Sequence, residues 1–374
     1  MNNRFAPAAR LTVAAIIASC LSGSAILAQD FGEMKLDNQK PKGKYVTLPP
    51  RLFSDLARPA LSSQTLQTWN GSYSYSGTTY TYNMVGAAPS TNSSATVQVY
   101  IIPVKIIVGR RNRLSTFDPA HILSNGNSVT QNTVLSPMFD ATTTYTLGGV
   151  NVGTTQYIDA YQRANFWGTV SSHTSSHLLL GGPTVLAEQT LTVPSSYGTT
   201  GSPFGFTAGL VDINWFDAQL PNIMAKLGIQ SNVFPVFLTY DVYLTQGGSC
   251  CIGGYHSAEG NASNPQSYTQ ASYIDHPGTF AQDVSALSHE VGEWADDPLV
   301  ANPNGNQTPC GILENGDPLE NTANFGDFPY ALHGFTYHLQ DLATLPYFGA
   351  PTSTTVNGWL SFHNASLSVC SNGS

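Results

Sequence analysis

The chain has 374 residues, of which 41% are hydrophobic and 10% are charged, and it contains 34 glycines and 23 prolines. Soluble globular domains usually carry about 25% charged residues, so this composition favours a β-rich, turn-rich exported protein over a disordered chain or a coiled coil. The formal net charge is -9. Nucleic acid is therefore not an expected partner, because a nucleic-acid binder needs a basic face that neutralises phosphates.

Residues 1–28 have the pattern of a secretory signal peptide. Arg4 and Arg10 precede an apolar run that begins at Leu11, and small residues with candidate cleavage points follow it. We expect this segment to be removed and the mature protein to be secreted or extracytoplasmic. The stretch that ends at Cys20 is similar to a bacterial lipobox, so the alternative is a form tethered to a membrane by a lipid at Cys20. No later apolar run reaches the ~20 residues that span a bilayer.

The next two segments differ in composition. Residues 29–60 are polar and rich in Lys, Arg and Pro, which predicts a linker or a pro-segment. Residues 61–205 are predicted to be β-rich, with strands over 73–82, where Tyr alternates with Ser and Thr, and over 96–108, where β-branched residues dominate. A helix is predicted over 156–167 from the spacing of its apolar residues.

Residues 206–374 alternate between helix and strand signals. We predict a helix over 216–227 that ends at Gly228, a strand over 233–244, a second strand over 268–274 and a helix that begins at Thr279 and ends before Pro298. The order of these elements predicts an α+β region in the C-terminal half, after a β-rich N-terminal half.

Four cysteines remain after the signal peptide, namely Cys250, Cys251, Cys310 and Cys370. An even number in an exported protein predicts two disulfides. We expect Cys250 and Cys251 to pair with Cys310 and Cys370, because a bond between neighbours strains the backbone. A four-thiolate zinc site is disfavoured, since the spacing contains no CxxC.

The segment SHEVGEWADDP carries the residues that point to chemistry. In the predicted helix, His289, Glu293 and Asp296 share one face, opposite an apolar stripe. No Lys or Arg follows Lys226, whereas thirteen of the 23 acidic residues do. Carboxylates without basic partners must stay solvated, take up protons or bind a cation. We therefore predict a metal site here, with a merely solvated polar face as the alternative.

Two metal ligands and a base follow from the spacing. His289 and Glu293 at i and i+4 are placed as ligands, and Glu290 as the general base. The stretch resembles the zincin metallopeptidases, with their HExxH motif present as HExxE. The resemblance implies Zn²⁺, a zincin-like C-terminal half built around a metal-bearing active-site helix, and a peptide or protein substrate cleaved by a metal-activated water. The carboxylate at the second position departs from the family, because it is a harder ligand than imidazole.

The third ligand of the metzincin branch is missing, because the residue ten after His289 is Leu299. A thermolysin-like arrangement takes a Glu from a later element. Glu314 is the first candidate, and Asp317 or Asp296 are alternatives. His256 and His333 are candidate substrate-binding residues, with structural roles as the alternative.

A second resemblance covers about residues 250–320. The SHEVGEWADDP stretch, the later ENGD and the upstream GGYHSA are similar to the plant phosphate-induced, EXORDIUM-like extracellular proteins, which implies an extracellular location. The competing function is a non-catalytic extracellular or cell-surface module in which the same acids bind Ca²⁺. The oxygen-rich loop over residues 296–307 suits that ion, whereas the histidine in the cluster favours zinc.

Overall fold

A computed structural model describes residues 33–37, 41–53, 64–110, 113–261, 263–300, 307–309, 311–353 and 358–364. The expected signal peptide, Cys20, Cys310 and Cys370 lie outside these residues. Within them, no helix has both the length and the apolar character to cross a bilayer.

Strands outnumber helices along the chain. The strands are β1 (Lys44–Thr47), β2 (Arg51–Phe53), β3 (Thr68–Tyr75), β4 (Thr78–Val85), β5 (Ser94–Arg110), β6 (Arg113–Phe117), β7 (Thr144–Leu147), β8 (Val150–Thr154), β9 (His177–Leu180), β10 (Thr184–Val185), β11 (Gln189–Thr192), β12 (Gly198–Gly201), β13 (Ala208–Asp212), β14 (Val233–Tyr240), β15 (Val242–Gln246), β16 (Ser249–Asn261), β17 (Asn264–Tyr273), β18 (Gln307–Thr308), β19 (Gly311–Ile312), β20 (Asp327–Leu332) and β21 (Phe335–Gln340). The α-helices are α1 (Val129–Val134), α2 (Tyr157–Asn165), α3 (Trp167–Val170), α4 (Ile213–Asp217), α5 (Leu220–Leu227), α6 (Ser285–Asp296) and α7 (Asp317–Glu320).

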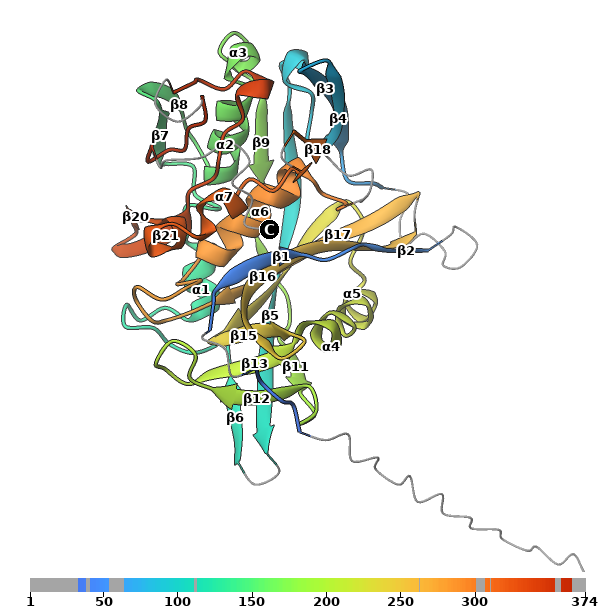
Figure 1. Ribbon diagram of the computed structural model, residues 1–374, viewed down its shortest axis with the longest axis vertical. Helices are drawn as coiled ribbons and strands as arrows, with labels where there is room; N and C mark the ends of the chain where they lie inside the picture. The colour runs from blue at the N-terminus through green and yellow to red at the C-terminus, as the bar shows by residue number, and fades with distance from the viewer. Residues whose placement is uncertain are drawn as a thin grey trace, which may run out of the picture. The chain divides into compact units, whose positions relative to one another are not determined.

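A mixed sheet of 13 strands organises the described residues (Figure 1). Its main path runs β10-β5-β14-β17-β16-β15-β13-β12, while β1 and β2 add to β16 and β6, β9 and β11 add to β5. The long strand β5 pairs in parallel with β14, and β16 pairs antiparallel with both β15 and β17. Strands far apart in the sequence therefore share one sheet.

Helices pack on both faces of this sheet. Along β5, Val97, Val99 and Ile101 belong to one buried cluster, and Ile102 and Val104 belong to another. This is the alternation expected of a strand covered on both faces, which reads as a continuous apolar run. The first cluster includes residues of α2 and α6, and the second includes residues of α4 and α5.

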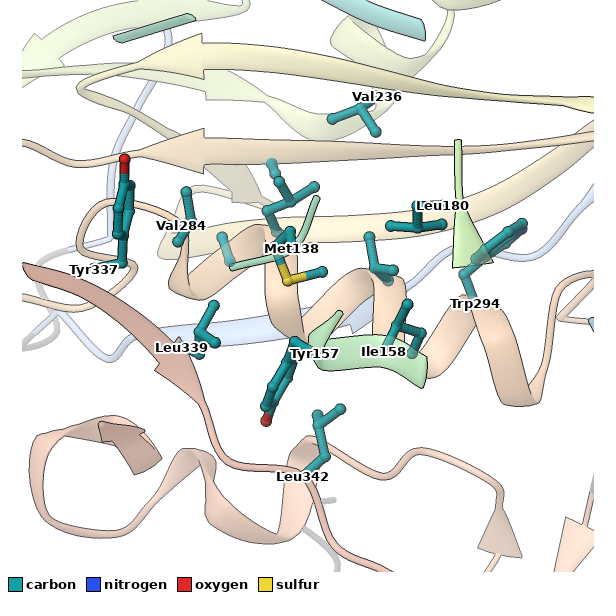
Figure 2. Packing of buried hydrophobic residues seen from close by; sticks show 14 of the residues in the cluster. Met138, Tyr157, Ile158, Leu180, Val236, Val284, Trp294, Tyr337, Leu339 and Leu342 are labelled. Atoms are coloured by element: carbon teal, nitrogen blue, oxygen red, sulfur yellow. The ribbon is translucent and has the colours of Figure 1, made fainter. Parts of the chain in front are cut away.

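Helix α6 packs against hydrophobic residues of α2 and of the sheet. Figure 2 shows Val284 and Trp294 near opposite ends of this helix, with Leu180 of β9 and Ile158 of α2 toward the Trp294 end, and all four belong to one buried cluster. The Trp294 ring stacks on Phe234 with centroids 3.8 Å apart, and its indole N–H donates to Ser267 Oγ at 2.9 Å. The helix is therefore anchored to the sheet by its apolar stripe.

The predicted α+β fold with a zincin-like C-terminal half is wrong. The structure is 42% strand and 19% helix, with a large mixed sheet that is nearly closed. Strands from both sides of the expected boundary at residue 205, such as β5 and β14, pair within this sheet. Local residue spacing does not report such long-range pairing, which is why the sequence suggested two separate halves.

Some predicted elements have different limits. The strand predicted over 233–244 is interrupted at Asp241, whose φ is 47°, and forms β14 and β15. The helix predicted from Thr279 begins at Ser285, because Ala281 and Asp283 adopt positive φ values of 61° and 39° that end regular structure there. Its predicted end is confirmed, since α6 ends at Asp296.

The predicted pairing of Cys250 and Cys251 with distant cysteines is also wrong. The two residues form a disulfide with each other at the start of β16. The Cys251 N–H donates to the Lys42 carbonyl at 2.9 Å, and the Cys250 carbonyl accepts from the Lys42 N–H at 3.2 Å. The two cysteines thus pair locally while their backbone joins the N-terminal segment.

Candidate metal centre

Helix α6 is buried on all sides, including the face that carries the acidic residues. It contacts β16 and β17 of the sheet and β21 of the hairpin β20–β21 (Figure 1). His289 and Glu290 are 0% exposed and Glu293 is 1% exposed. A solvated polar face is therefore excluded, and these groups need partners within the protein.

His289 directs a nitrogen lone pair at carboxylates. Its Nδ1 contacts Gln340 Oε1, and the Gln340 amide nitrogen donates to the carbonyls of Gly316 at 3.3 Å and Phe325 at 3.2 Å. This arrangement makes Gln340 Oε1 the acceptor and places the imidazole proton on Nδ1. The free Nε2 then faces Glu293 Oε1 at 3.0 Å and Asp317 Oδ1 at 3.8 Å.

His256 is arranged like His289, except that Nε2 donates the hydrogen bond and Nδ1 faces the carboxylates. Its Nε2–H donates to the Asp297 carbonyl at 3.2 Å, and its Nδ1 lies 3.3 Å from Glu290 Oε2 and 3.8 Å from Glu293 Oε2. Burial lowers the pKa of His256 to about 3, so the ring is neutral. A carbonyl oxygen on one ring nitrogen, with the other left bare, is the arrangement that orients metal-binding histidines.

Glu293 lies between the two imidazoles. Its Oε1 faces His289, its Oε2 faces His256, and its Oε1 also accepts from the Gly316 N–H at 3.2 Å. Two overlapping sets of residues could each hold an ion, because the ligand atoms within each set lie within 4.8 Å of one another. One set is His289, Glu290 and Glu293, and the other is His256, Glu293 and Glu314.

Within the described part of the chain, no Lys or Arg forms an ion pair with the carboxylates of this cluster. Burial and the neighbouring carboxylates raise the pKa of Glu290, Glu293 and Glu314 well above the ordinary value. Oε1 of Glu290 is buried and has no hydrogen-bond partner among the described residues. The ion pairs of Lys and Arg in the described chain engage Asp118, Glu188 and Asp217 instead.

Two glycines allow this close packing. A Cβ on Gly316 would lie 2.3 Å from His289 Nδ1, and a Cβ on Gly254 would lie 2.9 Å from Glu290 Cγ. Real Cβ atoms do not approach other atoms so closely, so both positions must lack a side chain for the cluster to form.

The remaining predicted site residues differ in whether they belong to the metal cluster. Glu314 joins the cluster, and its Oε1 accepts from Thr47 Oγ1 at 2.8 Å. Asp317 lies beside His289, with 30% of its side chain exposed. Asp296 lies in neither ligand set, because its carboxylate accepts from Tyr161, Gln162 and Asn315.

The two candidate substrate-binding histidines have different positions. His256 is buried within the cluster, whereas His333 lies in the turn of the hairpin β20–β21, with 47% of its side chain exposed and Asp140 Oδ2 3.2 Å from its Nε2. Sequence reasoning missed Gln340, Thr47 and Tyr45, which hold or cover the cluster. In the sequence, Gln340 was indicated only weakly, as a polar residue beside the apolar residues of its strand. No local pattern indicated a role for Thr47 or Tyr45.

No protein-family model, curated protein or solved structure matches the chain.

Proposed function

We propose that the chain is a zinc-dependent hydrolase that cleaves peptide bonds through a metal-activated water. One observation carries the proposal. The neutral imidazoles of His256 and His289 are each oriented by an oxygen acceptor at one nitrogen. Each aims the other nitrogen at buried carboxylates that have no Lys or Arg partner among the described residues. A divalent cation supplies the missing charge.

The donor set suits zinc better than calcium. Zn²⁺ combines imidazole and carboxylate ligands, whereas Ca²⁺ takes 6–8 oxygen ligands. His289 and Glu293 of α6 would hold the ion together with either His256 of β16 or Glu314 of the loop before α7. Three protein ligands leave the fourth position of zinc open for water. When bound, zinc acts as a Lewis acid and lowers the pKa of water.

Glu290 is the residue that we assign as the proton acceptor. It lies next to His289 in the chain, and its Oε1 has no hydrogen-bond partner among the described residues. Its other oxygen lies 3.3 Å from His256 Nδ1, and the side chain is fully buried, which limits its movement. A general base needs this combination of fixed position and open acceptor atom.

Turnover and metal content together test this assignment. Glu290→Gln keeps the shape but removes the proton acceptor, so we expect it to retain zinc and to lose hydrolysis of a peptide library by roughly 100-fold or more. His289→Ala is expected to lose both, and His333→Ala, a histidine outside the cluster, neither. Peptide cleavage at the wild-type rate by Glu290→Gln, or no cleavage by the zinc-loaded wild type, contradicts the proposed reaction.

A further inference from the structure

We infer that β1 closes this metal centre and that the edge of β16 on which β1 lies binds an extended peptide when β1 leaves. The inference rests on the proposed function, because it names how a peptide reaches that site. It concerns residues 44–53, which include β1 and β2.

The backbone of the sheet provides the docking edge. The pairing between β15 and β16 reaches Leu244 and Ile252 and goes no further along β16. From there β1 pairs in parallel with β16, with Lys44 opposite Ile252 and Thr47 opposite His256, and β2 continues along residues 259–261. Without these two strands, this edge of β16 would present unpaired N–H and C=O groups, which an extended peptide satisfies equally well.

The side chains of β1 meet the metal cluster directly. The Tyr45 ring stacks on the His289 ring with centroids 3.9 Å apart, and Thr47 Oγ1 donates to Glu314 at 2.8 Å. The Tyr45 N–H also donates to Glu320 Oε1 at 2.9 Å. The segment thus occupies the space beside the residues assigned to the metal.

The neighbouring residue provides a contrast within the same strand. Because side chains alternate along a strand, Val46 points away from Tyr45 and packs against the second core cluster, which includes Ile252 and Tyr255. Only one face of β1 therefore serves the metal centre.

The position of β1 determines how a substrate reaches the metal cluster and which kind of peptide can replace the strand. With Tyr45 lying on His289, which is 0% exposed, a substrate reaches the cluster only after β1 is displaced. Hydrolysis by the zinc-loaded protein therefore takes place in the molecules from which β1 has opened. The ligand that replaces β1 is an extended peptide that, like β1, presents an aromatic side chain and then, two residues later, a hydroxyl side chain.

The rate at which a chelator removes zinc from the loaded full-length mature protein tests the inference. We expect Tyr45→Ala to lose zinc about tenfold faster than the wild type, because the stacked ring no longer covers His289. Thr47→Val, a milder change, should accelerate the loss in the same direction. Val46→Ala is the matched control, with a rate within about twofold of the wild type. A synthetic peptide with the sequence GKYVTLP should slow zinc loss from Tyr45→Ala.

The outcomes separate this inference from the proposed function. Equal rates in Tyr45→Ala, Val46→Ala and the wild type, or equal acceleration by both substitutions, would overturn the role of β1. If the rates follow the expected order and no variant cleaves peptides, β1 still covers the centre and the proposed hydrolysis is wrong. Circular dichroism of each variant before chelation shows that the fold is intact.

Discussion

Glu293 and Asp296 lie three residues apart on α6, and their carboxylates have different partners. Glu293 faces two imidazoles, whereas Asp296 accepts hydrogen bonds from α2 and from Asn315. We expect Glu293→Gln to lose the metal. Asp296→Asn should keep the metal and lose about 1–3 kcal/mol of stability, because its amide N–H groups face other donors. Metal content by mass spectrometry and urea unfolding separate the two, and metal loss in Asp296→Asn would contradict the assignment.

Gly316 tests the position of His289 without removing a ligand. A Cβ at this position would lie 2.3 Å from His289 Nδ1, so Gly316→Ala is expected to displace the ring and weaken zinc binding by about 10–100-fold, as loss of an orienting contact does. Gly182→Ala, where a Cβ meets no atom within 4 Å, is the control. Competition with a zinc indicator measures both. Equal affinity in the two variants would mean that the ring position does not matter.

The sequence predicts the local part of this site and misses the distant part. His289, Glu290 and Glu293 follow from helical spacing, and the absence of nearby basic residues indicated a cation. Glu314 was predicted from a thermolysin-like arrangement of ligands, and it does join the cluster. The contacts of His256 and Thr47 could not be foreseen, because they depend on where β16 and β1 pass, and no local pattern encodes that.

Among the secondary-structure elements, β21 orients the His289 ring, a role that no pattern in its sequence predicts. It brings Gln340 to the His289 ring, where its amide oxygen accepts the Nδ1 proton and fixes the free nitrogen. Gln340→Met is expected to lower zinc affinity by about 10–100-fold, while Thr336→Val on the same strand leaves it unchanged. Isothermal titration with zinc measures the difference. Unchanged affinity in Gln340→Met would show that the ring is oriented by other contacts.

The helix ends predicted from the sequence were correct, whereas the predicted start of α6 was wrong because other hydrogen bonds hold the residues before it. Gly228 ends α5 in the left-handed conformation as expected, and the predicted end of α6 is confirmed. The start of α6 was misplaced because Gln282 accepts from the Gly278 N–H and Asp283 accepts from His338, instead of continuing a helix. A local hydrogen bond at Gln282 and a tertiary one at Asp283 therefore decided the outcome.

For the whole molecule, the buried carboxylates make stability depend on pH and on metal. Burial and mutual repulsion raise the pKa of Glu290, Glu293 and Glu314 in the folded state, so these three groups bind more protons in the metal-free folded chain than in the unfolded chain. The contribution of the three carboxylates is then fully present below the unfolded pKa of about 4.3 and is lost as pH rises. The lowered pKa values of the two buried histidines, His256 and His289, act in the opposite direction and offset part of this effect.

This sign gives a direct expectation for thermal unfolding. Metal-free protein should have a higher melting temperature at about pH 5 than at about pH 8, and zinc should raise the value at the higher pH most, because the ion takes the place of the protons. Differential scanning calorimetry with and without a chelator measures this. A metal-free protein that is more stable at the higher pH would contradict the picture of an uncompensated buried cluster.

The metal content of the full chain, purified without added metal, tests the central claim most directly. Inductively coupled plasma mass spectrometry is expected to find about one zinc per chain, because a buried site of this kind binds its ion as part of folding. His289→Ala should lose the zinc, and His333→Ala should retain it. Calcium alone, or no metal in a folded wild-type protein, would contradict the account.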